Sequence, residues 1–139
     1  MPTGRVVVPD YPAPTLHSSM SVAVALVAEG RMSEAVSEAM RLVERRVRSL
    51  TASDESGPTL MDSVFGARPP QLDITTATGT AAEDERESFR LLFIGAMLGL
   101  RYSQRVGIGA DTTAYETMEY LAFASMLMRR LDRAESRLG

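Results

Sequence analysis

The sequence predicts an all-α protein: a bundle of four to five helices preceded by an extended N-terminal arm. Apolar residues recur at helical spacing in several long segments, capping residues flank those segments, and no run makes a convincing sheet. The 139 residues fit one domain, and 45% hydrophobic with 24% charged residues is ordinary for a globular chain. We therefore expect an arm over residues 1–15 and a single helical domain over 16–139.

The first 50 residues contain an arm and two helices. Four prolines within the first 14 residues favour an extended arm. Residues 16–28 turn apolar, with Ser18 or Ser19 as the expected N-cap and Gly30 as the stop, although their valine alternation also fits a strand. Residues 33–50 predict a clear amphipathic helix, which Ser33 would cap and in which Glu44 would pair with Arg48 on the solvent side.

Three further helices are expected. Residues 59–66 form a short one that Thr59 caps and Gly66 ends, and the Pro- and Thr-rich residues 67–82 stay irregular. Residues 83–100 have an acidic start and apolar residues on several faces, which predicts a central helix buried nearly all round. The last helix starts with a capping box from Thr113 to Glu116 and is rich in methionine.

The composition excludes several classes of protein. With no cysteine and a single histidine, the chain has neither disulfides nor the ligands of a usual zinc site, so no metal or cofactor is expected. The longest apolar run is about half a membrane span and no signal peptide precedes it, so we expect a cytoplasmic protein without a membrane role. The net charge of −3 argues against a general nucleic-acid coat but leaves room for a local basic groove.

A polar cluster follows the apolar segment 91–100 and is the main candidate site. Arg101, Tyr102 and Arg105 could bind an anion or RNA, with the guanidinium groups on phosphate and the ring stacked on a base. The alternative is structural, since cations near a helix C-terminus also bind its last carbonyls.

Five stretches occur in an order that resembles a known family: "LHSSM", "AEGRMSEAVSEAMRLVERRVRSL", "GPTLMDSVFG", "ESFRLLFIGAMLGLR" and "AYETMEYLAFASMLMRRLDRA". From about residue 16 to 134 the chain is similar to the Ymh family of uncharacterised bacterial and phage-associated proteins. That family looks like a branch of the HEPN superfamily, helical bundles found in toxin–antitoxin and phage-defence systems. The resemblance implies a HEPN-like bundle and a homodimer.

Many HEPN proteins are metal-independent ribonucleases with an Arg-x(4–6)-His motif, and here that motif is degenerate. Arg101 matches the arginine, but Val106 stands where the histidine should be, and no histidine follows His17. RNA cleavage without a metal needs groups that exchange protons near neutral pH, which arginine cannot do, although it can still hold a phosphate. The sequence therefore indicates the remnant of a catalytic site.

Other candidates remain open at this stage. His17 could replace the missing histidine, from the same chain or from a partner subunit, although it fits a helix start better. Two arginine sets could form a nucleic-acid surface if they converge with Arg101; otherwise they are solvated faces. The sets are Arg41, Arg45, Arg46 and Arg48, and Arg129, Arg130, Arg133 and Arg137.

The expected function is non-catalytic: a HEPN-like protein of a defence or mobile-element system that acts through dimerisation and through binding of a protein partner or RNA. Its dimer would use the helix with Gly95 and Gly99 and the Met-rich last helix. One alternative is a metal-independent endoribonuclease with relocated groups, namely Arg101 and His17 as catalytic candidates with Tyr102 and Arg105. Another is an assembly protein of a phage or host complex, with higher-order oligomers.

Overall fold

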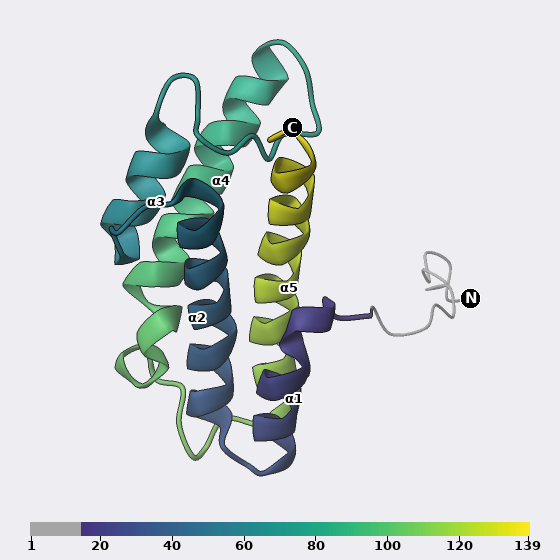
Figure 1. Cartoon of the computed structure of the whole chain (residues 1–139). Helices are drawn as coiled ribbons and strands as arrows, with labels where there is room; N and C mark the ends of the chain where they lie inside the picture. The colour runs from purple at the N-terminus through teal and green to yellow at the C-terminus, as the bar shows by residue number, and fades with distance from the viewer. Residues whose placement is uncertain (1–14) are drawn as a thin grey trace, which may run out of the picture.

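The computed structural model describes residues 15–139, so the expected arm lies outside the described residues except for Thr15. The described part has five α-helices, two 3₁₀ segments and no strand, which confirms the all-α prediction. In chain order the elements are η1 (Ser18–Met20), α1 (Ser21–Ala28), α2 (Met32–Thr51), α3 (Gly57–Gly66), α4 (Thr80–Leu98), η2 (Leu100–Val106) and α5 (Ala114–Ser136). In Figure 1, α2 and α5 stand side by side, with α1 against this pair and α3 and α4 beyond α2.

The central helix is α2, and the expectation that residues 83–100 would be central is wrong. α2 packs against α1, α3, α4, α5 and η2, whereas α4 packs mainly against α3 and η2. Leu91 and Leu98 of α4 remain 54% and 65% exposed, so this helix is not buried all round. Apolar residues occur on more than one face of α4, but within residues 15–139 only some of them are packed into the core.

The core is one continuous cluster of aliphatic, methionine and phenylalanine side chains. Phe65 of α3 stacks on Phe93 of α4 with the ring centroids 4.3 Å apart. Both rings are almost fully buried, and burying a side chain of this size contributes about 1.5–3 kcal/mol. This stack helps to hold α3 against α4.

At the helix starts, the Thr113 cap and the helical conformation of the first segment are confirmed. The caps expected at Ser18 or Ser19, at Ser33 and at Thr59 are wrong. Thr113 caps α5 as expected, because its hydroxyl accepts from Glu116 N at 3.0 Å. At the first helix the cap is His17 rather than Ser18 or Ser19, and an α-helix, not a strand, follows the short 3₁₀ turn. Ser33 and Thr59 cap nothing, since α2 begins at Met32 and α3 at Gly57, with Pro58 in its first turn. The segment expected to be irregular over residues 67–82 is irregular from 67 to 79, and α4 begins at Thr80.

The transition from α4 to η2 places the candidate polar residues. α4 ends at Leu98, and a Cβ on Gly99 would lie 3.1 Å from a methyl of Val106, so the returning chain packs closely there. Within η2, Tyr102 has non-helical angles of φ −116° and ψ 63°. This kink interrupts the 3₁₀ segment, and Gly107, at φ 85°, ends it.

No helix in residues 15–139 is both long enough and apolar enough to cross a membrane.

Candidate functional site

A hollow of about 390 Å³ lies between η2 and the first turns of α2. We call it the Tyr102 hollow. Its charged lining consists of three arginines, Arg41, Arg101 and Arg105, and two glutamates, Glu34 and Glu38. Counting these five side chains gives one net positive charge, so the hollow can attract an anion weakly, but it is not a strongly basic groove.

The Tyr102 ring is flanked by two guanidinium groups. The central carbon of Arg105 lies 4.5 Å from the ring centroid and that of Arg101 lies 5.2 Å from it, both in cation–π range. The tyrosine is 46% exposed. Three flat groups that can stack on a nucleobase or hold a phosphate thus lie together beside the hollow.

Three serine hydroxyls attach η2 to α2 beneath this cluster. Ser103 is buried, and its hydroxyl donates to the carbonyl of Ser33 at 2.6 Å. The hydroxyls of Ser33 and Ser37 lie 2.6 and 2.8 Å from Ser103 Oγ and donate to it, since its own proton is already used. Ser33, expected as a helix cap, therefore fixes the floor of the hollow instead.

Arg101 neutralises a buried carboxylate. Its Nε lies 3.3 Å from Oε1 of Glu44, whose side chain is only 8% exposed, and Oε2 of Glu44 accepts from Gly57 N at 2.7 Å. The expected pair between Glu44 and Arg48 is wrong, because the Glu44 carboxylate is buried against Arg101 and Gly57 instead of facing solvent. One carboxylate therefore connects α2, the start of α3 and η2, which gives Arg101 a structural role whatever else it does.

The carboxylates of the hollow are held by arginines. Glu34 is paired with Arg31, and Glu38 with Arg41 at 3.1 Å and Arg45 at 3.2 Å. Arg105, in contrast, forms no ion pair among the described residues and is exposed. Of the three arginines of the hollow, Arg105 has the most donors available for a ligand.

His17 lies in a different cluster, between the start of the first helix and α5. Its Nε2 donates to Asp132 at 3.0 Å, and Asp132 also pairs with Arg46 at 2.6 Å. Burial alone would raise the pKa of Asp132, but the bonds from Arg46 and His17 hold it below its ordinary value. The structure thus does not place His17 in the hollow with Arg101 in the same chain.

The same cluster aligns Ser19, His17 and Asp132 in the order of a hydrolase triad, which the sequence spacing did not reveal. Nδ1 of His17 lies 2.8 Å from Ser19 Oγ. The backbone N–H of Ser19 is directed at that same nitrogen at 3.2 Å, as in a helix cap. Because Nδ1 of His17 accepts this backbone N–H at the start of η1, we interpret the trio as a cap and not as a catalytic triad.

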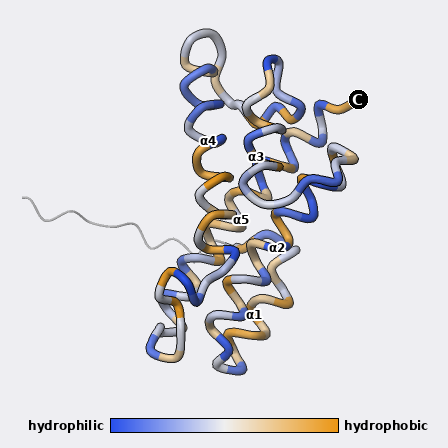
Figure 2. Tube along the Cα trace, turned by 90° about the vertical axis from the view of Figure 1, so that its left-hand side faces the viewer, coloured by the Kyte–Doolittle hydropathy of each residue, from blue (hydrophilic) through white to orange (hydrophobic). Residues whose placement is uncertain are grey.

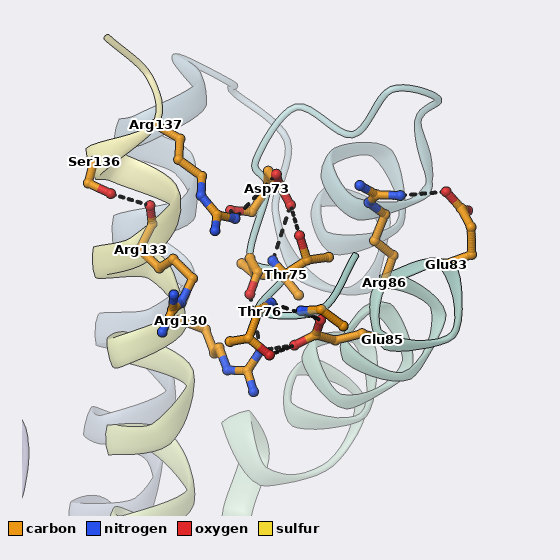
Figure 3. A network of polar contacts seen from close by, with 12 residues as sticks. Asp73, Thr75, Thr76, Glu83, Glu85, Arg86, Arg130, Arg133, Ser136 and Arg137 are labelled. Atoms are coloured by element: carbon orange, nitrogen blue, oxygen red, sulfur yellow. Dashed lines mark hydrogen bonds and ion pairs between the residues drawn. The ribbon is translucent and has the colours of Figure 1, made fainter. Parts of the chain in front are cut away.

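Arg130 of α5 and Arg137 at its end take part in a second polar cluster at the opposite end of α4, seen in Figure 3. We call it the Glu85 cluster. Glu85 accepts from the backbone N–H groups of Thr76 and Ala77 at 2.8 and 2.9 Å, from the Thr76 hydroxyl at 2.9 Å, and from Arg130. Burial would raise the pKa of Glu85, but these bonds lower it to about 2. Arg137 closes the cluster on Asp73 at 3.2 Å.

The two arginine sets do not converge. Arg130 and Arg137 are engaged in the Glu85 cluster, Arg129 binds Ser125 and the carbonyl of Thr15, and Arg46 points to α5. Only Arg41 joins Arg101 and Arg105. A continuous basic surface of the kind that would bind duplex nucleic acid is therefore not formed by these residues.

Residues 15–139 contain no group of three or more His, Asp or Glu side chains placed to hold a metal ion.

Residues 16–131 match the protein family described as "Protein of unknown function (Hypoth_ymh)". No curated protein and no solved structure matches the chain.

Proposed function

The chain belongs to the Ymh family of proteins of unknown function, and on that premise we propose that it is a non-catalytic protein with a HEPN-like bundle that binds single-stranded RNA in the Tyr102 hollow. The resemblance to HEPN proteins suggests the setting, a defence or mobile-element system. One observation supports the binding role most: a half-exposed aromatic ring flanked by two guanidinium groups beside a hollow.

Each part of this arrangement has a use in RNA recognition. An unstacked base gains about 1–3 kcal/mol by stacking on an aromatic side chain, and an arginine fork matches the oxygens of a phosphate. The hollow extends from the ring over the serines of α2, whose hydroxyl oxygens can accept a hydrogen bond from a ribose 2′-hydroxyl. A single strand fits better than a duplex because the basic surface is small.

The absence of catalysis is proposed on the chemistry of the lining. Cleavage of RNA without a metal requires a base for the 2′-hydroxyl and an acid for the leaving oxygen. The hollow is lined by no histidine, and its glutamates are held in ion pairs. An endoribonuclease using His17 would need that residue to arrive from a second subunit.

The test is binding of a fluorescent ten-nucleotide single-stranded RNA, measured by anisotropy at low salt. We expect Tyr102→Ala and Arg105→Ala each to weaken binding at least about tenfold, consistent with the loss of one stacked base or one charged contact. Tyr115→Ala and Arg133→Ala are the matched controls, because Tyr115 is 80% exposed and neither residue lines the hollow. The controls should stay within about twofold of the unmodified protein.

Two results would contradict the proposal. If the unmodified protein binds no RNA, or if all four variants bind equally well, the hollow is not an RNA site. If the RNA is cut in the presence of a metal chelator and His17→Ala abolishes the cutting, the protein is an endoribonuclease.

A further inference from the structure

A second hollow, of about 250 Å³, adjoins the Tyr102 hollow at the start of α2. We call it the Gly109 hollow. The two hollows have three lining residues in common, which we call the shared wall: Ser33, Glu34 and Gln104. From this wall the Gly109 hollow continues to Gly30 in the α1–α2 connection and to Gly109 after η2, whereas Tyr102 lines only the first hollow. A ligand longer than one nucleotide can therefore extend from Tyr102 into the Gly109 hollow.

Both hollows lie at the end of the molecule where α4 leads into η2. Figure 1 shows the α1–α2 connection and the chain after η2 at this same end. Figure 2 shows α4 changing from hydrophilic in its first turns to hydrophobic in its later turns, so the end of α4 offers a ligand few hydrogen-bonding side chains. A Cβ on Gly30 or on Gly109 would meet no atom within 4 Å, which leaves the far side of the second hollow open. The groups that can distinguish one base from another therefore come from the shared wall.

Gln104 supplies a free amide to the shared wall. Its side chain is exposed and makes no hydrogen bond with residues 15–139. Its backbone is fixed, because its carbonyl accepts from Gly107 N at 3.3 Å in the turn that ends η2. A glutamine amide has one oxygen that accepts hydrogen bonds and one nitrogen that donates two. It can therefore pair with a base edge that presents a donor next to an acceptor.

Glu34 adds a carboxylate that can only accept. Its side chain is 56% exposed, and each of its oxygens accepts one bond from Arg31, with Nε of Arg31 3.1 Å from Oε1. A carboxylate has about four lone-pair positions, so about two stay free for a ligand. Arg31 also lines the Gly109 hollow, but its Nη1 donates to Glu29 at 3.1 Å, so each of its nitrogens already has a carboxylate partner. This part of the lining therefore offers more free acceptors than free donors.

A base with an exocyclic amino group matches this excess of acceptors. Adenine, cytosine and guanine each carry such a group beside a ring nitrogen, and its two N–H donors can serve the oxygen of Gln104 and the carboxylate of Glu34 at once. Uracil has carbonyl oxygens on the same edge. A uracil oxygen turned toward Glu34 would meet a second acceptor with no proton between them, which leaves both groups unsatisfied.

From this arrangement we propose that the Gly109 hollow holds the nucleotide next to the one stacked on Tyr102, and that Gln104 and Glu34 select an amino-bearing base there against uracil. The inference rests on the proposed RNA binding and adds a base preference to it. Stacking on Tyr102 is tolerant of sequence, because every base has a π-face. The preference is therefore assigned to the shared wall alone.

Anisotropy with fluorescent ten-nucleotide RNAs, each made of a single base, tests the preference. Oligocytidylate and oligoadenylate should each bind about tenfold more tightly than oligouridylate, as expected for one bidentate contact between an amide and a base. The ratio of oligocytidylate to oligouridylate is the main readout, because the two bases have rings of the same size. Gln104→Ala and Glu34→Gln should each reduce this ratio to about threefold or less. Gln71→Ala and Glu119→Gln are the matched controls and should keep it, since both residues are exposed and line neither hollow.

Tyr102→Ala separates the preference from the binding itself. It should weaken the binding of oligocytidylate and oligouridylate alike and leave their ratio near tenfold, because the ring stacks on either base. Circular dichroism verifies that all variants fold. Equal affinity for the two RNAs in a protein whose binding depends on Tyr102, or a ratio that Gln104→Ala leaves unchanged, would overturn this inference and leave the proposed function standing. Absence of binding to all three RNAs would overturn both.

Discussion

The charged side chains at the two ends of α4 differ in whether they are paired within the chain. In the Glu85 cluster the charged pairs Glu85–Arg130 and Asp73–Arg137 form within the chain, and the Glu85 carboxylate accepts four bonds. In the Tyr102 hollow, Arg105 and the tyrosine ring are exposed, and Arg105 makes no ion pair among the described residues. The comparison teaches that the same residue type, arginine, stabilises the fold at one end and remains available to a ligand at the other.

The difference arises from the segment of the chain that is fixed at each end of α4. At the Glu85 cluster an irregular segment of the chain, residues 67–79, must be fixed to α4 and α5 without secondary structure of its own. Its backbone N–H groups need acceptors, and Glu85 provides them. At the hollow, η2 is fixed from below by serines, so the guanidinium of Arg105 is not required for the fold.

The largest expected effect is at Glu85. Glu85→Ala should lower the free energy of unfolding by about 3 kcal/mol, because it removes the acceptor of two backbone N–H groups and leaves Arg130, which lies 4.2 Å over the Phe89 ring, without its carboxylate. Urea denaturation measures this loss. Glu87→Ala is the control on the same helix; its pair with Arg90 is solvent-exposed, so this substitution should change the free energy of unfolding far less than Glu85→Ala.

A loss below about 1 kcal/mol in Glu85→Ala would remove the contrast between the two ends. It would mean that the Glu85 cluster contributes little to stability and that other contacts fix this end of α4.

Acid should weaken the Glu85 end of α4. The pKa of Glu85 is about 2 in the folded chain against an ordinary 4.5, so its stabilisation is complete above pH 4.5 and is lost as the pH falls toward 2. The lowered pKa of Asp73 acts in the same direction. Between these pH values the unmodified protein should lose about 2 kcal/mol more than Glu85→Gln. Equal losses in thermal melts of the two proteins would contradict this assignment.

Helix type and position were predictable because they depend on local patterns. The spacing of Val36, Met40 and Val43 is sufficient to place α2, and the threonine and glutamate at the start of α5 define its cap. The centre of the bundle was not predictable in this way. Apolar content alone suggested residues 83–100, but which face of a helix finds a partner depends on the tertiary arrangement, and Leu91 and Leu98 remain exposed.

The candidate site was predictable as a set of residues but not as a set of roles. The break after the apolar segment identified Arg101, Tyr102 and Arg105, and all three line one hollow. Nothing in their spacing indicates that Arg101 meets Glu44, which lies 57 positions earlier in the chain. Long-range pairs of this kind, like the contact of His17 with Asp132, depend on the packing of helices rather than on periodicity.

The smallest expected effect separates the two arginines that flank Tyr102. Arg101→Ala should lower the free energy of unfolding by about 1.5 kcal/mol, because it removes the cation that pairs with the buried Glu44. The carboxylate then keeps only the hydrogen bond from Gly57 N. The loss is smaller than for a fully buried pair because Arg101 is 21% exposed. Arg105→Ala should change stability by less than about 0.5 kcal/mol while RNA binding falls.

The two effects have a shared test, in which Glu44→Gln is added to Arg101→Ala. The neutral amide still accepts from Gly57 N but needs no cation, so the double variant should recover most of the lost stability in urea denaturation. No recovery would mean that Arg101 stabilises η2 by packing against Tyr102 rather than through the carboxylate. Recovery of stability without recovery of RNA binding would show that Arg101 also touches the ligand, so that one arginine serves the fold and the site together.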